Sequence, residues 1–262
     1  MAVVVGVAAV LGALWGRGPS PWLGALLVVV ALMSRRPWLL AGATLLLTGG
    51  LAARATAGMV PVVPGSFTGT ITLLGDPQPL TGGGWRVDVR ATDGRHLEAN
   101  ARTATMIAAI ESRAAGQELT VRGRLQRSPP GSDWLTQRHI VGQLALDDVL
   151  ATSNGSWPAR AANAVRATLE RGASVLPDRQ RPLFLGFVLG DTRGQPPDIT
   201  DDFQGSGLTH LLAVSGENVA FVLALAGPLL RRLSLRPRFA ATVGVIAFFA
   251  LVTRFEPSVL RA

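Results

Sequence analysis

An apolar run near the C-terminal end of the chain is interrupted by polar residues and then resumes. Residues Leu211 to Val214 are followed by Ser215-Gly216, the carboxylate of Glu217 and the amide of Asn218. A soluble core helix gains nothing from such a break, because buried polar groups cost free energy unless they are paired. In a membrane helix the break frees backbone groups, which lipid tolerates only where they are buried in protein or line a wet path. The pattern therefore predicts an interrupted membrane helix.

Arginines and tryptophans flank the other apolar segments. Arg17 and Arg35 enclose 17 uncharged residues, which is about the lower limit for a membrane span. Arginine stems extend such a span by reaching to the interface, and Trp15, Trp22 and Trp38 stand at segment ends, where interfacial aromatics occur. Core helices of a large soluble protein are the alternative. The predicted membrane helices are residues 2–15, 22–33, 38–53, 219–230 and 239–252.

The distribution of charge supports a multi-pass membrane protein. The net charge is +8, all 25 basic residues are arginine, and the absence of cysteine excludes disulfides and thiolate metal sites. The first 63 residues carry four arginines and no acids. Positive loops stay on the cytoplasmic side of a membrane. We therefore expect the loops with Arg35-Arg36 and with Arg231, Arg232, Arg236 and Arg238 to be cytoplasmic, and the region between residues 64 and 150 to lie outside.

A cleavable signal peptide is the alternative for the third apolar segment. Arg35-Arg36, the apolar stretch that follows and Ala55-Thr56-Ala57 resemble the three parts of such a peptide across residues 33–57. Two earlier apolar segments favour a membrane span instead. In both cases the domain that follows lies outside the membrane.

Residues 64–150 change to a pattern of short strands. Apolar residues alternate with polar ones five times, and turn sequences such as Asp93-Gly94 separate the runs. Ala104 to Ala114 has the pattern of one short helix. An order of three strands, a helix and two strands is that of the five-stranded OB barrel. The alternating apolar positions are Phe67, Ile71 and Leu73; Trp85, Val87 and Val89; Leu97, Ala99 and Ala101; Leu119, Val121 and Leu125; and Ile140, Leu144 and Leu146.

Residues 157–176 predict an amphipathic helix. Its apolar stripe consists of Trp157, Ala161, Val165, Leu169, Gly172 and Leu176, and the polar side holds Arg160, Asn163, Arg166 and Glu170. Such a helix either lies in the membrane interface or packs on the barrel or on neighbouring helices, and the sequence leaves both open.

The sequence from Gly207 to Phe221, GLTHLLAVSGENVAF, resembles the competence motif of the ComEC family, the membrane channel proteins of bacterial DNA uptake. The resemblance continues at Leu189-Gly190-Asp191, at Phe203 and at Glu256-Pro257-Ser258. It implies an OB-like domain after the first membrane helices. It also implies transport of single-stranded DNA across the cytoplasmic membrane. Asn218 stands where the family usually has a histidine.

The resemblance covers the N-terminal part of such a protein. Family members often end in a metallo-β-lactamase-like domain that needs clustered histidines, whereas this chain has three scattered histidines. The expected fold is an α-helical polytopic membrane protein with an inserted small all-β domain, the OB-like barrel. The expected domains are N-terminal transmembrane helices at 1–63, an extracytoplasmic barrel at 64–150, amphipathic linker helices at 151–206 and the start of the channel domain at 207–262.

Two sets of residues are candidates for contact with DNA. The interrupted helix supplies candidates for the translocation path, and the outward faces of the second and fourth strands supply a basic surface beside Trp85, since OB folds bind single strands with basic grooves and aromatic platforms. The expected partners are single-stranded DNA and the lipid bilayer; other DNA-uptake proteins and further copies of the chain are compatible with the resemblance. The path residues are His210, Ser215, Gly216, Glu217 and Asn218, and the basic surface is Arg86, Arg90, Arg122 and Arg124.

The sequence supports an enzymatic function less than transport. His210 and Ser215 form the only plausible hydrolytic pair, and the G-x-S-x-G motif of a nucleophile elbow is absent. The acidic residues Asp191, Asp198, Asp201 and Asp202 could bind a metal ion, but Asp198 follows Pro196-Pro197 as a helix N-cap would. We therefore expect no enzyme activity, no metal and no cofactor in this chain. A hydrolase and a membrane-anchored scaffold remain the alternatives to a channel.

Overall fold

The computed structural model describes residues 2–256 and 259, except residues 19, 35, 36, 81, 130, 133, 134, 136, 137, 192 and 208–215. The chain divides into two compact units, and the strands of the sheet contribute residues to both. The first unit comprises Met1–Gly69, Arg90–Ala99 and Gly123–Ala145, and the second comprises Thr70–Val89, Asn100–Arg122 and Leu146–Ala262.

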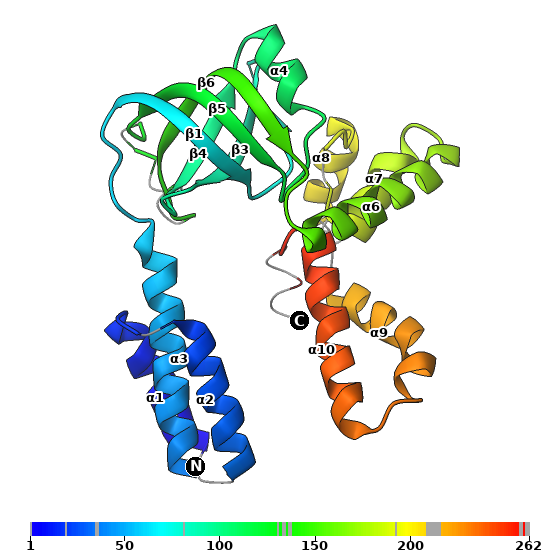
Figure 1. Cartoon of the computed structure of the whole chain (residues 1–262). Coiled ribbons are helices and arrows are strands. Elements are labelled where there is room, and N and C mark those ends of the chain that lie inside the picture. Colours follow the sequence, from blue (N-terminus) through cyan, green and yellow to red (C-terminus); the bar gives the residue numbers. More distant parts are fainter. Residues whose placement is uncertain are drawn as a thin grey trace. The chain divides into compact units, whose positions relative to one another are not determined.

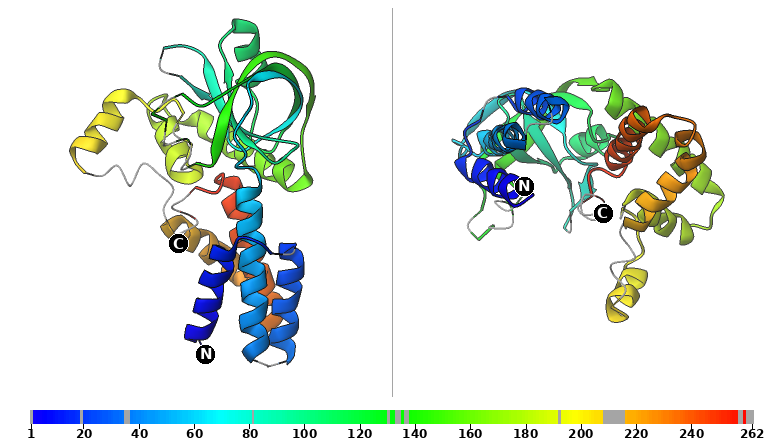
Figure 2. Two further views of the ribbon diagram at one scale, coloured as in Figure 1. Left: turned by 90° about the vertical axis from the view of Figure 1, so that its left-hand side faces the viewer. Right: turned by 90° about the horizontal axis from the view of Figure 1, so that it is seen from below.

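Three apolar helices form the N-terminal part of the first unit. These are α1 (Ala2–Trp15), α2 (Pro21–Ser34) and α3 (Pro37–Ala57), and α3 packs against both of the others (Figures 1 and 2). Small residues permit this close packing, as is usual between membrane helices. A Cβ atom on Gly24 would lie 2.6 Å from the Cα atom of Leu47, and Ala31 and Ala43 are buried.

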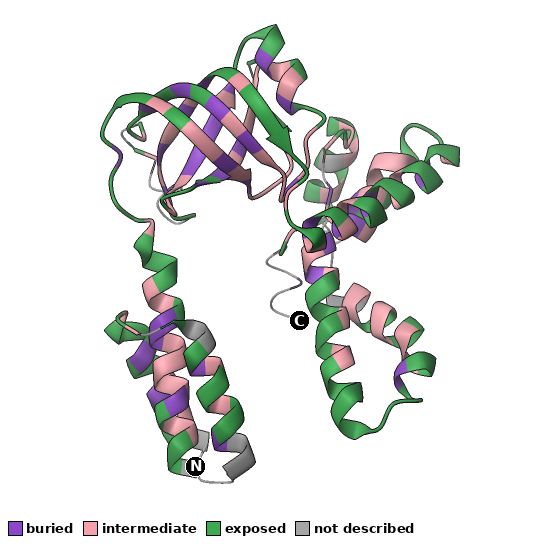
Figure 3. Cartoon of the chain, in the orientation of Figure 1, coloured by how far each residue is buried: buried purple, intermediate pink, exposed green. Residues whose placement is uncertain are grey.

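Among the residues that the structure describes, two helices are long and apolar enough to cross a membrane by length and composition. They are Trp38–Ala57, within α3, and Leu235–Val252, which is α10; the apolar helices Val3–Trp15 and Asn218–Leu230 are shorter. Most of α10 is exposed (Figure 3), including Phe239 with 73% of its surface accessible. Helices thus form at the predicted apolar segments, and that all five of them cross a membrane stays a prediction.

The middle of the chain forms a closed barrel. Five strands, β1 (Gly65–Leu73), β3 (Trp85–Ala91), β4 (His96–Ala101), β5 (Glu118–Gln126) and β6 (Ile140–Ser153), pair in the order β1-β5-β6-β4-β3, and β3 also pairs with β1. The two-residue strand β2 (Gln78–Pro79) adds to β3. The helix α4 (Ala104–Ile110) lies between the third and fourth long strands, and the Thr103 side chain caps it by accepting from Met106 N. The predicted OB-like order is confirmed.

The barrel core follows from the alternation of side chains along each strand. In β5 the residues Leu119, Val121 and Leu125 are buried, whereas Arg122 and Arg124 are exposed. Figure 3 shows this alternation of buried and exposed positions along the strands. The core also contains Ile71, Leu73, Val87, Val89, Leu97, Ile110 and Leu144.

Short helices follow the barrel in the second unit. They are α6 (Trp157–Gly172), the 3₁₀ turn η1 (Ala173–Val175), α7 (Gln180–Leu189) and α8 (Pro197–Gly205), and the apolar helices α9 (Gly216–Leu230) and α10 come next. The predicted N-cap of α8 is wrong, because Pro196 caps this helix. Proline fixes the backbone at the start of a helix, so Asp198 lies in the first turn, where its carboxylate pairs with Arg179.

The buried face of α6 differs from the predicted apolar stripe. Ala159, Ala162 and Arg166 are its buried residues, whereas Trp157 has 73% of its surface exposed and Val165 has 37%. Arg166 was expected on the polar, solvated side. It is buried because its guanidinium group finds several partners inside the second unit, which the periodicity of one helix does not reveal.

Candidate functional site

The connection after α7 directs an acidic side chain into the interior of the second unit. Gly190 ends α7 with a φ of 72°, a left-handed conformation that glycine adopts without strain. The amide of Gly190 donates to Gly186 O at 3.0 Å, and the amide of Asp191 donates to Leu185 O at 3.3 Å. The chain therefore turns back on the helix end, and Asp191 points inward with only 9% of its surface exposed.

Arg166 of α6 is the most buried charge at this site, with 3% of its surface exposed. Its Nη1 atom donates to Leu189 O at 3.2 Å and to Val252 O at 3.0 Å, which are the last carbonyl groups of α7 and α10. Its Nη2 atom lies 3.1 Å from an oxygen of Asp76 and 3.2 Å from an oxygen of Asp191. One side chain therefore joins two helix ends and two carboxylates.

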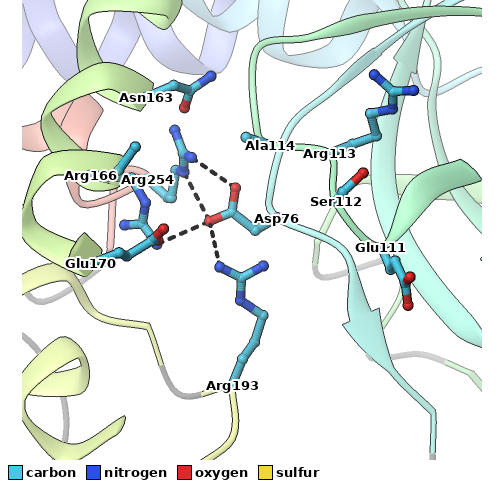
Figure 4. A pocket seen from close by; sticks show the side chains of 11 residues that line it. Asp76, Glu111, Ser112, Arg113, Ala114, Asn163, Arg166, Glu170, Arg193 and Arg254 are labelled. Carbon is cyan, nitrogen blue, oxygen red and sulfur yellow. Dashed lines mark hydrogen bonds and ion pairs between the residues drawn. The ribbon is translucent and has the colours of Figure 1, made fainter. Parts of the chain in front are cut away.

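Asp76 comes from the turn between β1 and β2 and meets three arginines (Figure 4). Arg254 contacts both of its oxygens, at 2.8 and 3.2 Å, and Arg193 lies 3.7 Å away. The backbone amide of Ala115 also donates to Asp76, at 2.9 Å. The arginine–aspartate cluster is thus Asp76, Arg166, Asp191, Arg193 and Arg254.

The backbone at the end of α10 is strained where it presents Arg254. Arg254 and Phe255 have φ values of 59° and 55°, a left-handed conformation that costs a residue other than glycine about 1–3 kcal/mol. Such strain persists only where the surroundings enforce it. The paired hydrogen bonds between Arg254 and Asp76 supply that constraint.

Burial and the neighbouring charges shift the pKa values of three members of the cluster. Burial alone would raise the pKa of Asp76, but the Arg254 and Arg166 guanidinium groups outweigh it and hold the pKa below its ordinary value of 3.8. The hydrogen bond to Asp191 raises the pKa of Arg193. Burial lowers the pKa of Arg166. Nearby, burial also raises the pKa of Glu256.

A polar cavity of about 350 Å³ adjoins the cluster. Four arginines and three carboxylates line the cavity, so positive and negative charges largely cancel. The lining therefore offers no uniformly positive surface to an anion. Within the described ranges, no group of three metal-ligating side chains gathers at any point. The site is therefore suited to join segments of the second unit. Its lining is Asp76, Glu111, Ser112, Arg113, Ala114, Asn163, Arg166, Ala167, Glu170, Arg193 and Arg254.

Three of the five predicted path residues, Gly216, Glu217 and Asn218, lie at the start of α9. His210 and Ser215 are outside the described residues. Gly216 begins α9, and Glu217 follows in its first turn. The side-chain amide of Asn218 donates to Phe187 O of α7 at 2.6 Å. The start of α9 is thereby fixed to α7, the helix whose last carbonyl Arg166 binds.

The predicted basic surface lies on β3 and β5, the two strands that flank β1 in the barrel. Arg90, Arg122 and Arg124 are exposed, whereas Arg86 is half-buried. Trp85 is half-buried at the start of β3, where it pairs with Pro79. These positions agree with outward faces, and a role in binding DNA stays a prediction.

The cluster is not predictable from the local pattern of its members. Asp76 had the pattern of a turn residue, Arg166 that of a solvated helix face, and Arg254 that of a boundary of an apolar segment. Of the members of the cluster, only Asp191 belongs to a sequence motif that the resemblance includes, Leu189-Gly190-Asp191. One signal was available: the motif residues Asp191 and Glu256 are acids beside arginines, a pattern that indicates ion pairs.

The comparisons with known proteins agree with the motif. Residues 187–262 match the family Competence, described as competence protein. No curated protein and no solved structure matches the chain. The matched segment contains Asn218 and three members of the cluster, Asp191, Arg193 and Arg254. Residues 187–262 of this chain are therefore similar to the competence protein family, in agreement with the predicted resemblance to a ComEC-type protein.

Proposed function

We propose that the chain is part of a membrane channel that takes up single-stranded DNA across the cytoplasmic membrane in natural transformation. The match of residues 187–262 to the competence protein family carries this proposal. The apolar helices α3 and α10, long enough to cross a membrane, support a membrane location. The proposal assigns transport to these residues and no catalytic step.

The proposed path runs beside the start of α9. The free amides at a helix N-terminus need polar partners at membrane depth, and residues 215–218 supply polar groups there. Glu217 is a poor partner for a phosphate because both are anionic, so we assign it to pairing with an arginine or to gating. Asn218 holds the start of α9 against α7 through Phe187 O.

The arginine–aspartate cluster supplies the proposed coupling between the barrel and the channel segment. Asp76 belongs to the β1–β2 turn, and its partners Arg193 and Arg254 belong to the competence segment. In OB folds the loop between the first two long strands contributes to ligand binding. A strand of DNA that moves this loop would therefore act on the end of α10.

Asn218→Leu tests the proposed path. Leucine removes the hydrogen bond to Phe187 O at similar volume, so we expect loss of DNA uptake at unchanged membrane abundance. The matched control is Gln204→Leu, which removes an exposed amide from α8. Uptake is measured as labelled DNA that becomes resistant to external nuclease, and abundance is measured by immunoblotting of membranes.

Two results would contradict the proposal at different levels. Normal uptake in cells that lack the whole protein would exclude the transport function. Normal uptake by Asn218→Leu, in cells whose uptake depends on the protein, would remove the start of α9 from the path and leave the transport function standing.

A further inference from the structure

The amphipathic helix α6 is attached to the end of a candidate membrane span. Arg166, in the middle of α6, donates to Val252 O, the last carbonyl group of α10. Ala162 of α6 shares a core cluster with Val252 and Leu189, and Leu169 packs against it. Figure 1 shows the C-terminal end of α10 beside α6.

The length of α10 places this contact at a membrane boundary. An α-helix of 18 residues is about 27 Å long, close to the hydrocarbon thickness of about 30 Å. The loop before α10 carries Arg231 and Arg232, and the first turn of α10 carries Arg236 and Arg238. These guanidinium groups belong outside the hydrocarbon, which arginine stems can reach from the end of a span. If α10 crosses the membrane, Val252 lies at the opposite boundary, and α6 lies at that depth.

The exposed stripe of α6 is continuous with the edge that packs on α10. With about 3.6 residues per turn, Val165, Ala161 and Trp157 follow Leu169 around the helix. Val165 and Trp157 have 37% and 73% of their surfaces exposed, and Val175 of the adjoining turn η1 has 85%. The apolar stripe therefore begins on the α10 side of α6, where Leu169 and Ala161 are half-buried, and the described part of the chain leaves Val165 and Trp157 exposed.

The opposite exposed edge of α6 is basic. Arg160 and Arg171 are exposed there, and Asn163 beyond them donates to Ala115 O of the second unit at 3.1 Å. Glu170, the acid of this helix, lines the polar cavity instead. An apolar edge next to a span and an arginine edge away from it match the two sides of a membrane interface.

We propose that α6 lies in the interface of an anionic lipid membrane. The stripe of Trp157, Ala161 and Val165 enters the boundary between acyl chains and headgroups, and Arg160 and Arg171 contact lipid phosphates. Arg166 anchors the buried side of the helix to the end of α10. This inference rests on the proposed function, since it requires α10 to cross the membrane.

Single-cysteine labelling of the whole chain tests the proposal, because the protein has no cysteine of its own. The variants are Val165→Cys on the stripe, Ala167→Cys on the opposite exposed side, Thr152→Cys on exposed β6 and Val243→Cys in the middle of α10. Each carries an environment-sensitive fluorophore in vesicles of phosphatidylethanolamine and phosphatidylglycerol. Quenching by spin-labelled lipid is compared with quenching by aqueous iodide.

At position 165 we expect lipid quenching to exceed iodide quenching at least threefold, and at positions 167 and 152 we expect the reverse. Protection of position 165 from both quenchers would show that protein covers the stripe, and iodide quenching there would show that the stripe faces water; each overturns the proposal. Absence of lipid quenching at position 243 would refute the membrane crossing of α10 and with it the premise from the proposed function. Lipid quenching at position 243 without lipid quenching at position 165 would refute the interfacial position of α6 and leave the membrane crossing of α10 standing.

Discussion

The Arg166 guanidinium group binds the terminal carbonyl groups of α7 and α10 and also contacts Asp76 and Asp191. A cation is favourable at the C-terminal end of a helix, because the free carbonyl groups there carry partial negative charge. Its burial is tolerated because most of its donors have acceptors. Removing one member of such a buried group leaves uncompensated charge, which costs more than the intact group contributes.

Arg166→Met should destabilise the protein by about 3–5 kcal/mol, because it leaves two buried carboxylates with fewer partners. Arg160→Met removes an exposed arginine from the same helix and should change the free energy of unfolding by no more than about 0.5 kcal/mol. Urea unfolding in detergent, followed by circular dichroism, measures both. Equal effects of the two variants would show that the cluster does not stabilise the fold.

Asp76 should make stability depend on pH. Its pKa in the folded protein is below the ordinary value of 3.8, so the folded state favours the carboxylate. This contribution is fully present above the ordinary pKa and is lost as the pH falls through the lowered folded pKa. The difference in free energy of unfolding between the natural protein and Asp76→Asn should therefore shrink below about pH 4. A difference that stays constant between neutral pH and about pH 3 would contradict the assignment.

At the scale of elements, the alternation of apolar and polar side chains decides which face of each barrel strand is buried. The buried face of a helix is decided by the elements that pack against it. Each barrel strand places its apolar side chains inward at every second residue, so β5 buries Val121 and exposes Arg122. The buried face of α6 is not the face that its sequence pattern predicts. Its apolar stripe is exposed, and its buried face contains a charge, since the partners of Arg166 come from other elements.

Val121→Ala should cost about 1–3 kcal/mol of unfolding free energy, through lost burial and a cavity in the barrel. Arg122→Ala, one residue further along the exposed face, should stay within about 0.5 kcal/mol. Thermal unfolding of the whole chain compares the two variants. Equal losses of stability would mean that the faces of β5 are not distinguished by burial.

For the whole molecule, the placement of arginines sets the expected orientation in the membrane. The loops with Arg35-Arg36 and with Arg231, Arg232, Arg236 and Arg238 contain no acids. Such loops resist translocation, so we expect them in the cytoplasm and the barrel on the outer side.

Cysteines introduced at Ser34 and Ser234 should therefore resist a membrane-impermeant thiol reagent in intact cells. A cysteine at Ser128, in the loop after β5, should react. Labelling is read out on the purified protein, with permeabilised cells as the control for reactivity. Reaction at positions 34 and 234 together with protection at 128 would invert the proposed orientation.

The sequence by itself determines the elements with a regular side-chain pattern, which are the barrel strands and the apolar helices. The alternation around Val87 and Val121 predicts strands, and the strand–helix order predicts an OB-like barrel, because local side-chain periodicity decides which face can be buried. The apolar segments likewise predict the helices α1, α2, α3, α9 and α10. The motif from Gly207 to Phe221 indicates the family.

The tertiary structure alone decided where the charged residues meet. Asp76 and Arg254 are 178 positions apart, and no periodicity relates a turn of the barrel to the end of an apolar helix. Arg166 has the local pattern of a solvated residue, yet its burial depends on carbonyl groups and carboxylates that three distant segments supply. Pairing of buried charges is a property of the assembled packing, because only packing removes water and supplies the partners at once.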